Sequence, residues 1–343
     1  MDSTKIKNME EFAALSGISR PTLSKYFNNP DSVRQTTRMR IESALEKYDY
    51  RPNFYAVNQN RRLTKNIGVV VPYLADPFFS EIARMMERRC IEAGYAPSLF
   101  NSHGETAQEI EILQSLRSLK PAGVLLAPLG RSSDKSAIEL FCRDIPTVLF
   151  DSSLDGIGHA FVGSDNYSFV SQTVEYLVRT GEPPSFLEMR TPANPNAHRR
   201  RKAYVQVMER LGLEGHVISV EGEGWAFEEI GRAGGFKVLD EKTLPTKTVL
   251  CSNDRLAIGF LSACYERGLR IGRNAGSDMR VASHDDHPYA KFTCPSLTTA
   301  AHDYTAVSEN AAETLFEIIE SGGNVSARKD IVFPARLIIR NSA

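Results

Sequence analysis

The sequence predicts a small all-α head followed by a large α/β body. The first 50 residues have the pattern of three short helices, whereas apolar runs alternate with amphipathic helical stretches from Ile67 onward. Such alternation is typical of a parallel sheet covered by helices. The length of 343 residues, at roughly 150 residues per domain, leaves room for two compact bodies and a small appendage.

The composition is that of an ordinary water-soluble globular protein, with 42% hydrophobic and 24% charged residues. It excludes a disordered, collagenous or coiled-coil chain. No uncharged apolar stretch approaches the roughly 18 residues that span a bilayer, and residues 1–11 lack the apolar segment of a signal peptide. We therefore expect a cytoplasmic protein with no membrane partner.

The cysteines support the same compartment. Their number is odd and no Cys-x-x-Cys occurs, so neither a disulfide framework nor a zinc ribbon is implied. They are Cys90, Cys142, Cys251, Cys264 and Cys294. A reducing cytoplasm fits this usage.

The net charge of -1 conceals an asymmetry between the two parts of the chain. Residues 1–65 hold 12 Lys/Arg against 7 Asp/Glu, and the remainder holds 29 against 35. A basic head on an acidic body suggests a polyanion partner for the head. A basic solvated face is the alternative that charge alone leaves open.

The head has the start and stop signals of two consecutive short helices. Asn8 is placed to cap the first and Gly17 to end it, while Ser19 caps a second whose first turn contains Pro21. The segment Asn28-Asn29-Pro30 stops the second helix. Two short helices joined by a tight turn with glycine form a helix-turn-helix, whose second helix meets base edges in the major groove.

The outward positions of this second helix are the first candidates for DNA contact. They are Arg20, Pro21, Thr22 and Lys25. An apolar stripe on the first helix consists of Met9, Phe12, Ala13 and Leu15. A third helix over about 36–47 completes a three-helix core, and its Arg38 and Arg40 suit phosphate contact. The apolar residues expected to close the core are Met39, Ile41, Leu45 and Tyr48. A helical hairpin for protein contact is the alternative, but the polar-to-basic run YRPNFYAVNQNRR that follows indicates a hinge.

The body shows six apolar runs that predict strands and six stretches that predict helices. The predicted strands are 67–71, 123–127, 147–151, 185–189, 248–251 and 279–283. The predicted helices lie near 78–93, 106–119, 166–179, 198–211, 226–239 and 254–268. Neither Gly-x-Gly-x-x-Gly nor a Walker lysine loop follows these strands, which argues against dehydrogenase and NTPase chemistry.

Polar residues follow several strands directly. They are the loop Asp76 to Phe79, Asn101, Asp151, Asn253 and Asp285. Open α/β sheets bind ligands at the carboxyl ends of their strands, so these side chains predict a small-molecule site. Strand-end capping is the plainer interpretation of each carboxylate.

Metal binding and catalysis find little support. The run from His284 to His287 contains residue types that bind zinc, but adjacent side chains of an extended segment diverge and do not face one ion. There is no nucleophile elbow and no carboxylate pair with hydrolase spacing. We expect no metal, no cofactor and no enzyme activity.

Several ordered motifs together resemble the lactose-repressor (LacI/GalR) family of bacterial transcription regulators. They are ISRPTLSKYFNN at 18–29, YRPNFYAVNQ at 50–59, IGVVVPYLADPFF at 67–79, SND at 252–254 and SHDDHPYAKFTCPSLTT at 283–299. The resemblance runs from about residue 8 to the C-terminus. Any one motif alone is a weak signal, but their order in one chain is specific.

The resemblance implies a hinge that becomes helical on the operator, pairs in the minor groove and pries apart a base step with a leucine. Asn53 and Ala56 match hinge positions, but Gln59 stands where the family usually has leucine, and a polar amide intercalates less well. The implied DNA contacts are Ser19, Arg20, Pro21, Thr22, Lys25, Asn28, Arg38, Asn53, Ala56 and Gln59.

For the body, the resemblance implies two Rossmann-like lobes, like those of periplasmic sugar-binding proteins, closing on a small molecule. The implied effector residues are Asp76, Phe78, Phe79, Asn101, Asp151, Arg200, Trp225, Asn253, Asp285 and Tyr304. Carboxylates, amides, a guanidinium and aromatic faces suit a sugar or a sugar derivative. Trp225 is open to a second interpretation as plain core, and the register among Arg199, Arg200 and Arg201 is open by one residue.

The sequence as a whole predicts a cytoplasmic, homodimeric transcription regulator, a repressor, that binds palindromic operator DNA and is controlled by a carbohydrate effector. The expected domains are a headpiece over 1–50, a hinge over 51–65 and an effector-binding and dimerisation domain over 66–343. The alternative function is a cytoplasmic solute-binding module without DNA-reading function.

Overall fold

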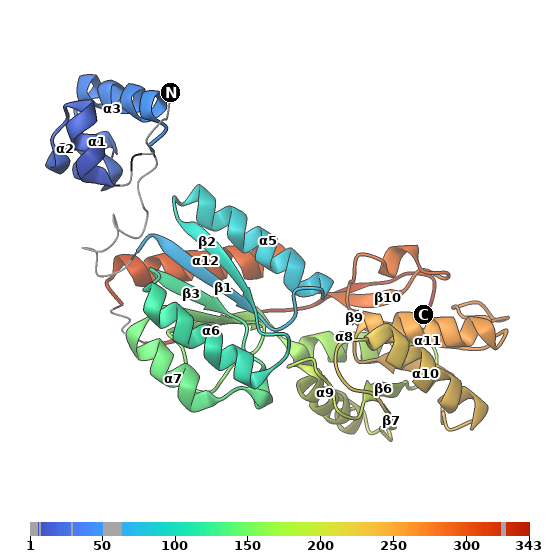
Figure 1. Ribbon diagram of the computed structural model, residues 1–343. Coiled ribbons are helices and arrows are strands. Elements are labelled where there is room, and N and C mark those ends of the chain that lie inside the picture. Colours follow the sequence, from blue (N-terminus) through green and yellow to red (C-terminus); the bar gives the residue numbers. More distant parts are fainter. Residues whose placement is uncertain (1–5, 7, 29, 51–63, 324–326) are drawn as a thin grey trace. The chain divides into compact units, whose positions relative to one another are not determined.

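The computed structural model describes residues 6, 8–28, 30–50, 64–323 and 327–343 (Figure 1). The chain divides into two compact units, Met1–Thr64 and Lys65–Ala343. The described residues of the first unit form only helices, and those of the second form an α/β body, as the sequence predicts.

The first unit contains α1 (Met9–Ser16), α2 (Arg20–Asn28), the short η1 (Pro30–Ser32) and α3 (Gln35–Tyr48). The predicted caps are confirmed: the Asn8 side chain accepts from the Glu11 backbone N–H, and the Ser19 hydroxyl accepts from that of Thr22. Gly17 ends α1 with φ of 62°, a left-handed conformation that suits glycine.

The core of this unit is small. It consists of Phe12, Ile18, Leu23, Ile41 and Tyr50, with Phe12 stacked on Tyr50. The expectation that Met39 contributes to it is wrong, because its exposed fraction is 61%, and Leu15 of the predicted apolar stripe is 52% exposed. Ile41 takes the inward position of α3, and Met39, two residues away on a helix of 3.6 residues per turn, faces the other side.

The first lobe of the body is a six-stranded parallel sheet in the order β11-β5-β4-β3-β1-β2. Its strands are β1 (Asn66–Val71), β2 (Ala96–Asn101), β3 (Gly123–Leu126), β4 (Thr147–Phe150), β5 (Ala160–Ser164) and β11 (Lys329–Phe333). Its helices are α5 (Pro77–Glu92), α6 (Thr106–Leu119), α7 (Lys135–Asp144) and α12 (Tyr304–Glu320), with η2 at Gly130–Ser132.

The second lobe is a sheet in the order β12-β10-β9-β8-β6-β7, parallel except for the pair β10 and β12. Its strands are β6 (Ser185–Met189), β7 (Val217–Val220), β8 (Thr248–Cys251), β9 (Arg280–Asp285), β10 (Thr298–Ala301) and β12 (Arg336–Ile338). Its helices are α8 (Asn166–Thr180), α9 (Ala197–Arg210), α10 (Phe227–Asp240) and α11 (Asp254–Glu266), with η3 at Ala290–Phe292.

All six predicted body strands and six predicted helices are present, with ends within about two residues. The elements that the sequence pattern did not predict are β2, β5, β7, β10, β11, β12, α7 and α12. Several of these lack a continuous apolar run: β2 is an edge strand with an exposed face, and β10 is Thr-Thr-Ala-Ala. The chain crosses between lobes after β5, after β10 and after β11. Within the described part of the chain, no helix combines the length and apolarity needed to cross a membrane.

Candidate functional site

A cavity lies between the two lobes, at the carboxyl ends of their central strands. It is lined by Asp76, Phe78, Phe79, Asp151, Asn194, Arg200, Trp225, Phe227, Asn253, Asp254, Arg255, Asp285, His287, His302 and Tyr304. Nine of the ten predicted effector residues are in this set. The free volume among the side chains is only about 20 Å³, enough for about one water. We call it the central cavity, and the lobes are closed on it.

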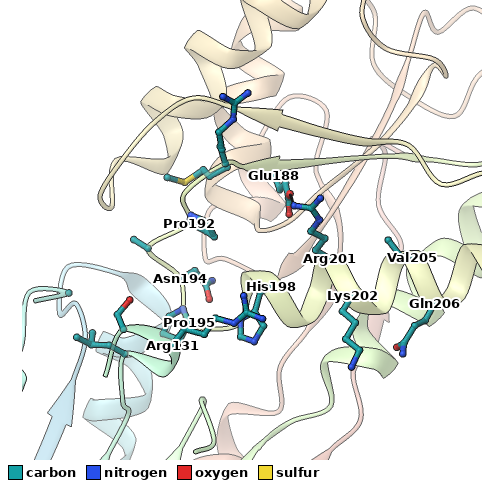
Figure 2. Close-up of a pocket in the computed structure, with 16 residues that line it drawn as sticks. Arg131, Glu188, Pro192, Asn194, Pro195, His198, Arg201, Lys202, Val205 and Gln206 are labelled. Carbon is teal, nitrogen blue, oxygen red and sulfur yellow. Dashed lines mark hydrogen bonds and ion pairs between the residues drawn. The ribbon is translucent and has the colours of Figure 1, made fainter. Parts of the chain in front are cut away.

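A larger cavity opens beside the central cavity, and Asn194 lines both (Figure 2). Its volume is about 630 Å³. One wall comes from η2 and Gly104 of the first lobe and the other from α9 and residues 188–195 of the second. We call it the mouth cavity.

Asn101 is the predicted effector residue that lines neither cavity. It ends β2, and its amide lies 3.2 Å from the His103 ring and accepts from the His103 backbone N–H. Because β2 is the outermost strand of its sheet, its carboxyl end lies away from the central strands that face the cavity. The structure thus places Asn101 outside both linings, and its role in effector binding stays a prediction.

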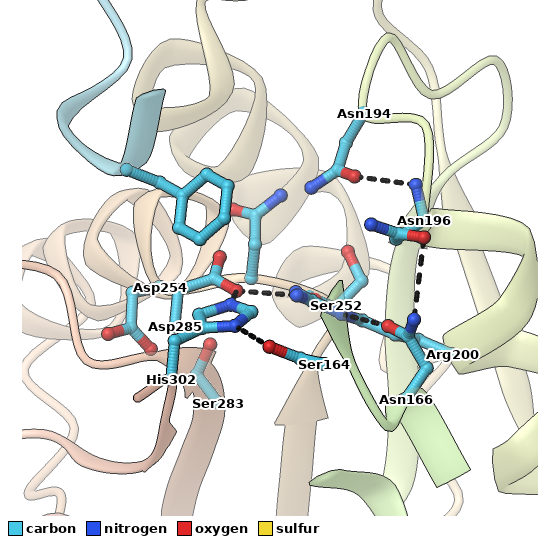
Figure 3. Close-up of polar contacts among 12 residues, drawn as sticks. Ser164, Asn166, Asn194, Asn196, Arg200, Ser252, Asp254, Ser283, Asp285 and His302 are labelled. Atoms are coloured by element: carbon cyan, nitrogen blue, oxygen red, sulfur yellow. Dashed lines mark hydrogen bonds and ion pairs between the residues drawn. The ribbon is translucent and has the colours of Figure 1, made fainter. Parts of the chain in front are cut away.

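The buried guanidinium of Arg200 organises the second-lobe wall of the central cavity (Figure 3). Its Nη2 lies 2.6 Å from Asp285 Oδ1, and its Nη1 donates to the Ser252 carbonyl oxygen over 2.8 Å. Arg199 turns to Ser153 and Arg201 to Glu188. Of the three adjacent arginines, Arg200 is therefore the one that lines the cavity.

His302 is a central residue that the sequence analysis missed. Its Nδ1 lies 2.7 Å from Ser164 Oγ and its Nε2 lies 3.1 Å from Asp285 Oδ1 (Figure 3). It sits on the crossing between β10 and α12, so its contacts reach both lobes. Sequence offers little signal for it, because Ser164 and His302 are 138 residues apart.

Asp285 is held in an unusual conformation. Its backbone φ is 115°, which L-residues rarely adopt and which is retained where the surroundings fix it. Burial alone raises the pKa of its carboxyl, but the Arg200 charge and the His302 hydrogen bond outweigh burial, so the pKa lies below its ordinary value. Both contacts use Oδ1 of the carboxylate.

Two of the polar lining residues also cap helices. Asp76 caps α5 by accepting from the Phe78 N–H, and Asn253 caps α11 by accepting from the Leu256 N–H. Capping and cavity lining are thus combined in the same side chains. Asp254, also buried, accepts from Thr299 Oγ1 and the His287 N–H, both over 2.7 Å.

Asp151 behaves differently from Asp285. It follows β4 with φ of 61° and accepts from Asn196 Nδ2 over 2.9 Å. Burial raises the pKa of its carboxyl to about 7, and the charge of Arg200 offsets burial only in part. Asp151 therefore holds a proton up to near-neutral pH.

Aromatic side chains form the remaining wall. Trp225 of the second lobe stacks on Tyr73 of the first with ring centroids 4.8 Å apart, and Phe79 and Phe227 meet it edge-on. Trp225 is part of the core and of the cavity wall at once. Phe78 lies against His302 and Tyr304. Flat rings beside carboxylates and a guanidinium can hold a ring that carries hydroxyl groups.

Several polar contacts join the closed lobes across the cleft. Asp76 pairs with Arg255 over 3.1 Å, Asp151 bonds to Asn196, and Arg199 donates to Ser153 Oγ over 2.6 Å. In each of these contacts one residue belongs to the first lobe, namely Asp76, Asp151 or Ser153. The other belongs to the second lobe. These polar bonds must rearrange when the lobes separate.

The run from His284 to His287 sends its side chains to different places. His284 is buried, Asp286 pairs with Arg340 over 2.6 Å, and the His287 ring accepts from the Tyr289 N–H. Among the residues that the structure describes, no group of three His, Cys, Asp or Glu side chains is arranged to hold a metal ion.

In the first unit, the predicted DNA contacts of α2 lie on its surface. Arg20, Pro21 and Lys25 are exposed, and Ser19 bonds to Thr22 over 2.8 Å. Arg20 pairs with Glu10 over 3.0 Å, and Arg38 pairs with Asp31 and Glu42. Asn28 ends α2, and Asn53, Ala56 and Gln59 lie outside the described residues. Exposed pairs of this kind are worth about 0–1 kcal/mol, so both arginines can be redirected to phosphates at little cost.

Each of the two parts of the chain is similar to a known protein family. Residues 8–53 match the model of bacterial regulatory proteins of the lacI family, and residues 176–343 match the periplasmic binding protein-like domain. The transcriptional repressor CytR of Escherichia coli is 28% identical over 97% of this chain and 95% of its own length. The ribose operon repressor of Bacillus subtilis is 27% identical over 91% of each chain.

Solved structures share the fold. A Lac repressor bound to ONPG in the repressed state superposes with a TM-score of 0.83 at 22% identity, covering 99% of this chain and 100% of that one. A complex of the transcriptional regulator CelR with cellobiose gives a TM-score of 0.68 at 21% identity, covering 98% and 100%. The arrangement of a helix-turn-helix unit and a two-lobed α/β body is thus common to all of them.

Proposed function

The chain belongs to the lacI family of bacterial regulatory proteins, and from this premise we propose that it is a transcriptional repressor switched by a small molecule between its lobes. The observation that carries the switch is the central cavity. Its polar and aromatic lining suits a ligand, yet its free volume is about 20 Å³. Small-molecule sites usually measure roughly 300–1,000 Å³, so an effector enters only when the lobes move.

The effector is a sugar, a polyol or a nucleoside. Charged groups of both signs line the central cavity and most are already paired, which favours a neutral ligand with many hydroxyl groups over an ion. The ring stack of Trp225 and Tyr73 offers an apolar face to a sugar ring. Relatives are named for ribose, and solved neighbours contain ribose or cellobiose.

The ten predicted residues divide into two roles within this proposal. Arg200, Asp285 and Asp151 exchange hydrogen bonds with the effector hydroxyls, and the aromatic side chains hold its ring. Asp76 and Asn253 act through the helices that they cap and through lobe closure. Asn101 has no contact role in the proposal, because it lies beside His103.

Operator binding requires two copies of the head. A single helix-turn-helix unit buries little DNA surface, and a two-fold dimer matches a palindromic site with half-sites about one helical turn apart. We propose that α2 reads bases through Arg20 and Lys25, that Arg38 contacts phosphate, and that Asn53, Ala56 and Gln59 take part in the hinge. The effector shifts operator affinity by preferring one arrangement of the lobes, a coupling of typically 1–3 kcal/mol.

The cytoplasm is the proposed location, and turnover of the bound molecule is not part of the proposal. Known relatives are transcriptional regulators, and a DNA-reading protein acts where the DNA is. A turnover assay on any sugar that binds tests the second point directly.

The test is fluorescence-anisotropy binding of the full chain to its own upstream DNA at two salt concentrations, with a scrambled duplex as control. Tight, sequence-selective and salt-steep binding that one sugar pool releases is the expected result. Sugar binding without selective DNA binding would instead establish the solute-binding alternative. Identical operator affinity with and without every sugar that binds would remove the switch.

A further inference from the structure

The mouth cavity is large enough for a second small molecule. Its volume of about 630 Å³ lies within the usual range of ligand sites, and both lobes build it (Figure 2). Arg131 on η2 forms part of the first-lobe wall, and His198 and Lys202 lie one turn apart on the α9 wall. None of the predicted effector residues lines this cavity.

The lining is strongly cationic. Arg131, Arg190, Arg201 and Lys202 face it, against the single carboxylate of Glu188. Arg201 is neutralised by Glu188 over 2.9 Å and Arg190 by Glu221 over 2.5 Å. Across the described ranges of the chain, Arg131 and Lys202 have no ion-pair partner. Two uncompensated cations from opposite lobes therefore share one cavity, which concentrates anions there.

The segment that carries Arg131 is held firmly in place. The buried carboxylate of Glu109 accepts from the Leu129 N–H over 3.0 Å and from Ser133 Oγ over 3.2 Å. Thr106 Oγ1 donates to the Ser132 carbonyl oxygen over 2.6 Å. Gly130 lies so close to the second lobe that a Cβ there would be 3.2 Å from Pro195 Cβ. The backbone around Arg131 is thus fixed before any ligand arrives, which lowers the entropy cost of binding.

His198 adds a partly buried ring to the α9 wall, one helical turn from Lys202. Its pKa lies below the ordinary value because the ring is partly buried and because the charges of Arg131 and Arg199 are near. The ring donates a hydrogen bond to the Pro195 backbone carbonyl oxygen, so the single N–H of a neutral ring is already used within the protein. The lowered pKa of His198 shows that the Arg131 charge acts on the α9 wall.

We propose that the mouth cavity binds an organic phosphate, with the phosphate group held by Arg131 and Lys202. A phosphate monoester carries about two negative charges at pH 7, which matches two unpaired cations better than a monocarboxylate does. The rest of the cavity, with Leu129, Pro192 and Val205 in its lining, accommodates the organic part. Because the cations belong to opposite lobes, the bound anion holds the lobes in the closed arrangement. This site goes beyond the proposed effector site and acts beside it.

The test is isothermal titration calorimetry of the full chain at constant ionic strength with ribose 5-phosphate, inorganic phosphate, ribose and gluconate as probes. Ribose 5-phosphate is expected to bind and inorganic phosphate to compete with it, while gluconate binds at least tenfold more weakly. Arg131→Gln and Lys202→Gln should each weaken ribose 5-phosphate binding about tenfold or more, since each removes a charge-assisted hydrogen bond. Circular dichroism checks that each variant is folded.

Two control variants locate the binding. Lys135→Gln removes an exposed cation four residues from Arg131 that does not line the cavity, and it should leave binding unchanged. Phe78→Ala alters only the central cavity and should also leave it unchanged. Absence of saturable binding, an equal loss in Lys135→Gln, or a loss in Phe78→Ala but not in Arg131→Gln would overturn the proposal. The titration contains no DNA, so its outcome is separate from that of the repressor assay.

Discussion

Asp76, the N-cap of α5, lies 3.1 Å from Arg255 in the first turn of α11, so one ion pair joins the N-terminal ends of two helices that belong to different lobes. Arg255 is also bonded twice to Glu228 of its own lobe, over 2.7 Å each. Lobe separation therefore breaks the bond to Asp76 but leaves the arginine neutralised. This makes the pair suited to reversible closure, because no buried charge is stranded when it opens.

Asp76→Asn should loosen closure without unfolding the protein. Asparagine still caps α5 through its side-chain oxygen, so only the charge across the cleft is lost. We expect the free energy of unfolding to change by less than about 1 kcal/mol, while the affinity for an effector that requires closed lobes falls about tenfold. Calorimetry with the identified effector and urea unfolding measure the two quantities. Unchanged effector affinity in Asp76→Asn would show that the pair does not control closure.

Asp285→Asn should destabilise the body severely. The Arg200 side chain is 3% exposed, and without its carboxylate partner it becomes an uncompensated buried cation. Breaking such a pair costs about 3–5 kcal/mol, and the double variant Arg200→Met with Asp285→Asn should recover much of the loss. Urea unfolding measures both. Glu81→Gln, which breaks an exposed pair with Arg84, is the control and should change stability by less than about 1 kcal/mol. Equal losses for the two single variants would contradict a special role for Arg200.

Asp151 should give the body a pH-dependent stability. Its pKa is about 7 in the folded chain against 3.8 for an ordinary aspartate, so the folded state binds more protons between these values. The protonated Asp151 carboxyl contributes its full share of the free energy of unfolding below about pH 4. This contribution is lost as the pH rises to about 7. Asp151→Asn cannot titrate and should exceed the parent in stability at pH 8 by about 2–4 kcal/mol, but not at pH 4. Urea unfolding of both proteins at the two pH values decides; a difference independent of pH would exclude this assignment.

Lys25 and Arg38 should affect DNA binding in different ways. Lys25 is exposed on α2. Lys25→Ala should weaken binding to the operator by about 1–3 kcal/mol and remove the preference for one base at a single operator position, while binding to other sequences stays unchanged. Arg38→Ala should weaken binding to all sequences and flatten the dependence on salt. Anisotropy with single-base operator variants at several salt concentrations separates the two effects. Uniform losses from both substitutions would argue against this division.

Gln59→Leu should tighten operator binding if the family wedge acts in this chain. Leucine inserts between base steps more readily than a polar amide does, and the resulting bend allows more protein surface to meet the DNA. Gln59 lies outside the described residues, so the prediction rests on the sequence resemblance. An operator duplex labelled at its ends reports both affinity and bending. Weaker or unchanged affinity would count against the wedge account.

The sequence by itself determined the helical head, the α/β class of the body and most of the strands and helices that carry the site. Caps at Asn8 and Ser19 were visible because capping is a local interaction, and β1 or β8 because buried parallel strands are continuous apolar runs. Strand β2 was not visible, since an edge strand with an exposed face lacks that pattern. The position of Asn101 apart from the other predicted effector residues was not visible for a related reason, because the strand order that puts β2 at the edge is a property of the whole sheet.

Only the tertiary structure decided which polar groups act together. Ser164, Asp285 and His302 come from three distant segments: Ser164 and His302 lie where the chain crosses between the lobes, and Asp285 ends a central strand of the second lobe. The choice of Arg200 over its two neighbours also required the structure, since helix α9 turns each arginine to a different partner. A short stretch of sequence shows which side chains can form hydrogen bonds and whether apolar residues recur with the period of a helix or a strand. The burial of a side chain and its ion-pair partner depend instead on segments far apart in the chain. The two uncompensated cations of the mouth cavity are of this second kind, because Arg131 and Lys202 face one space only after the two lobes have packed.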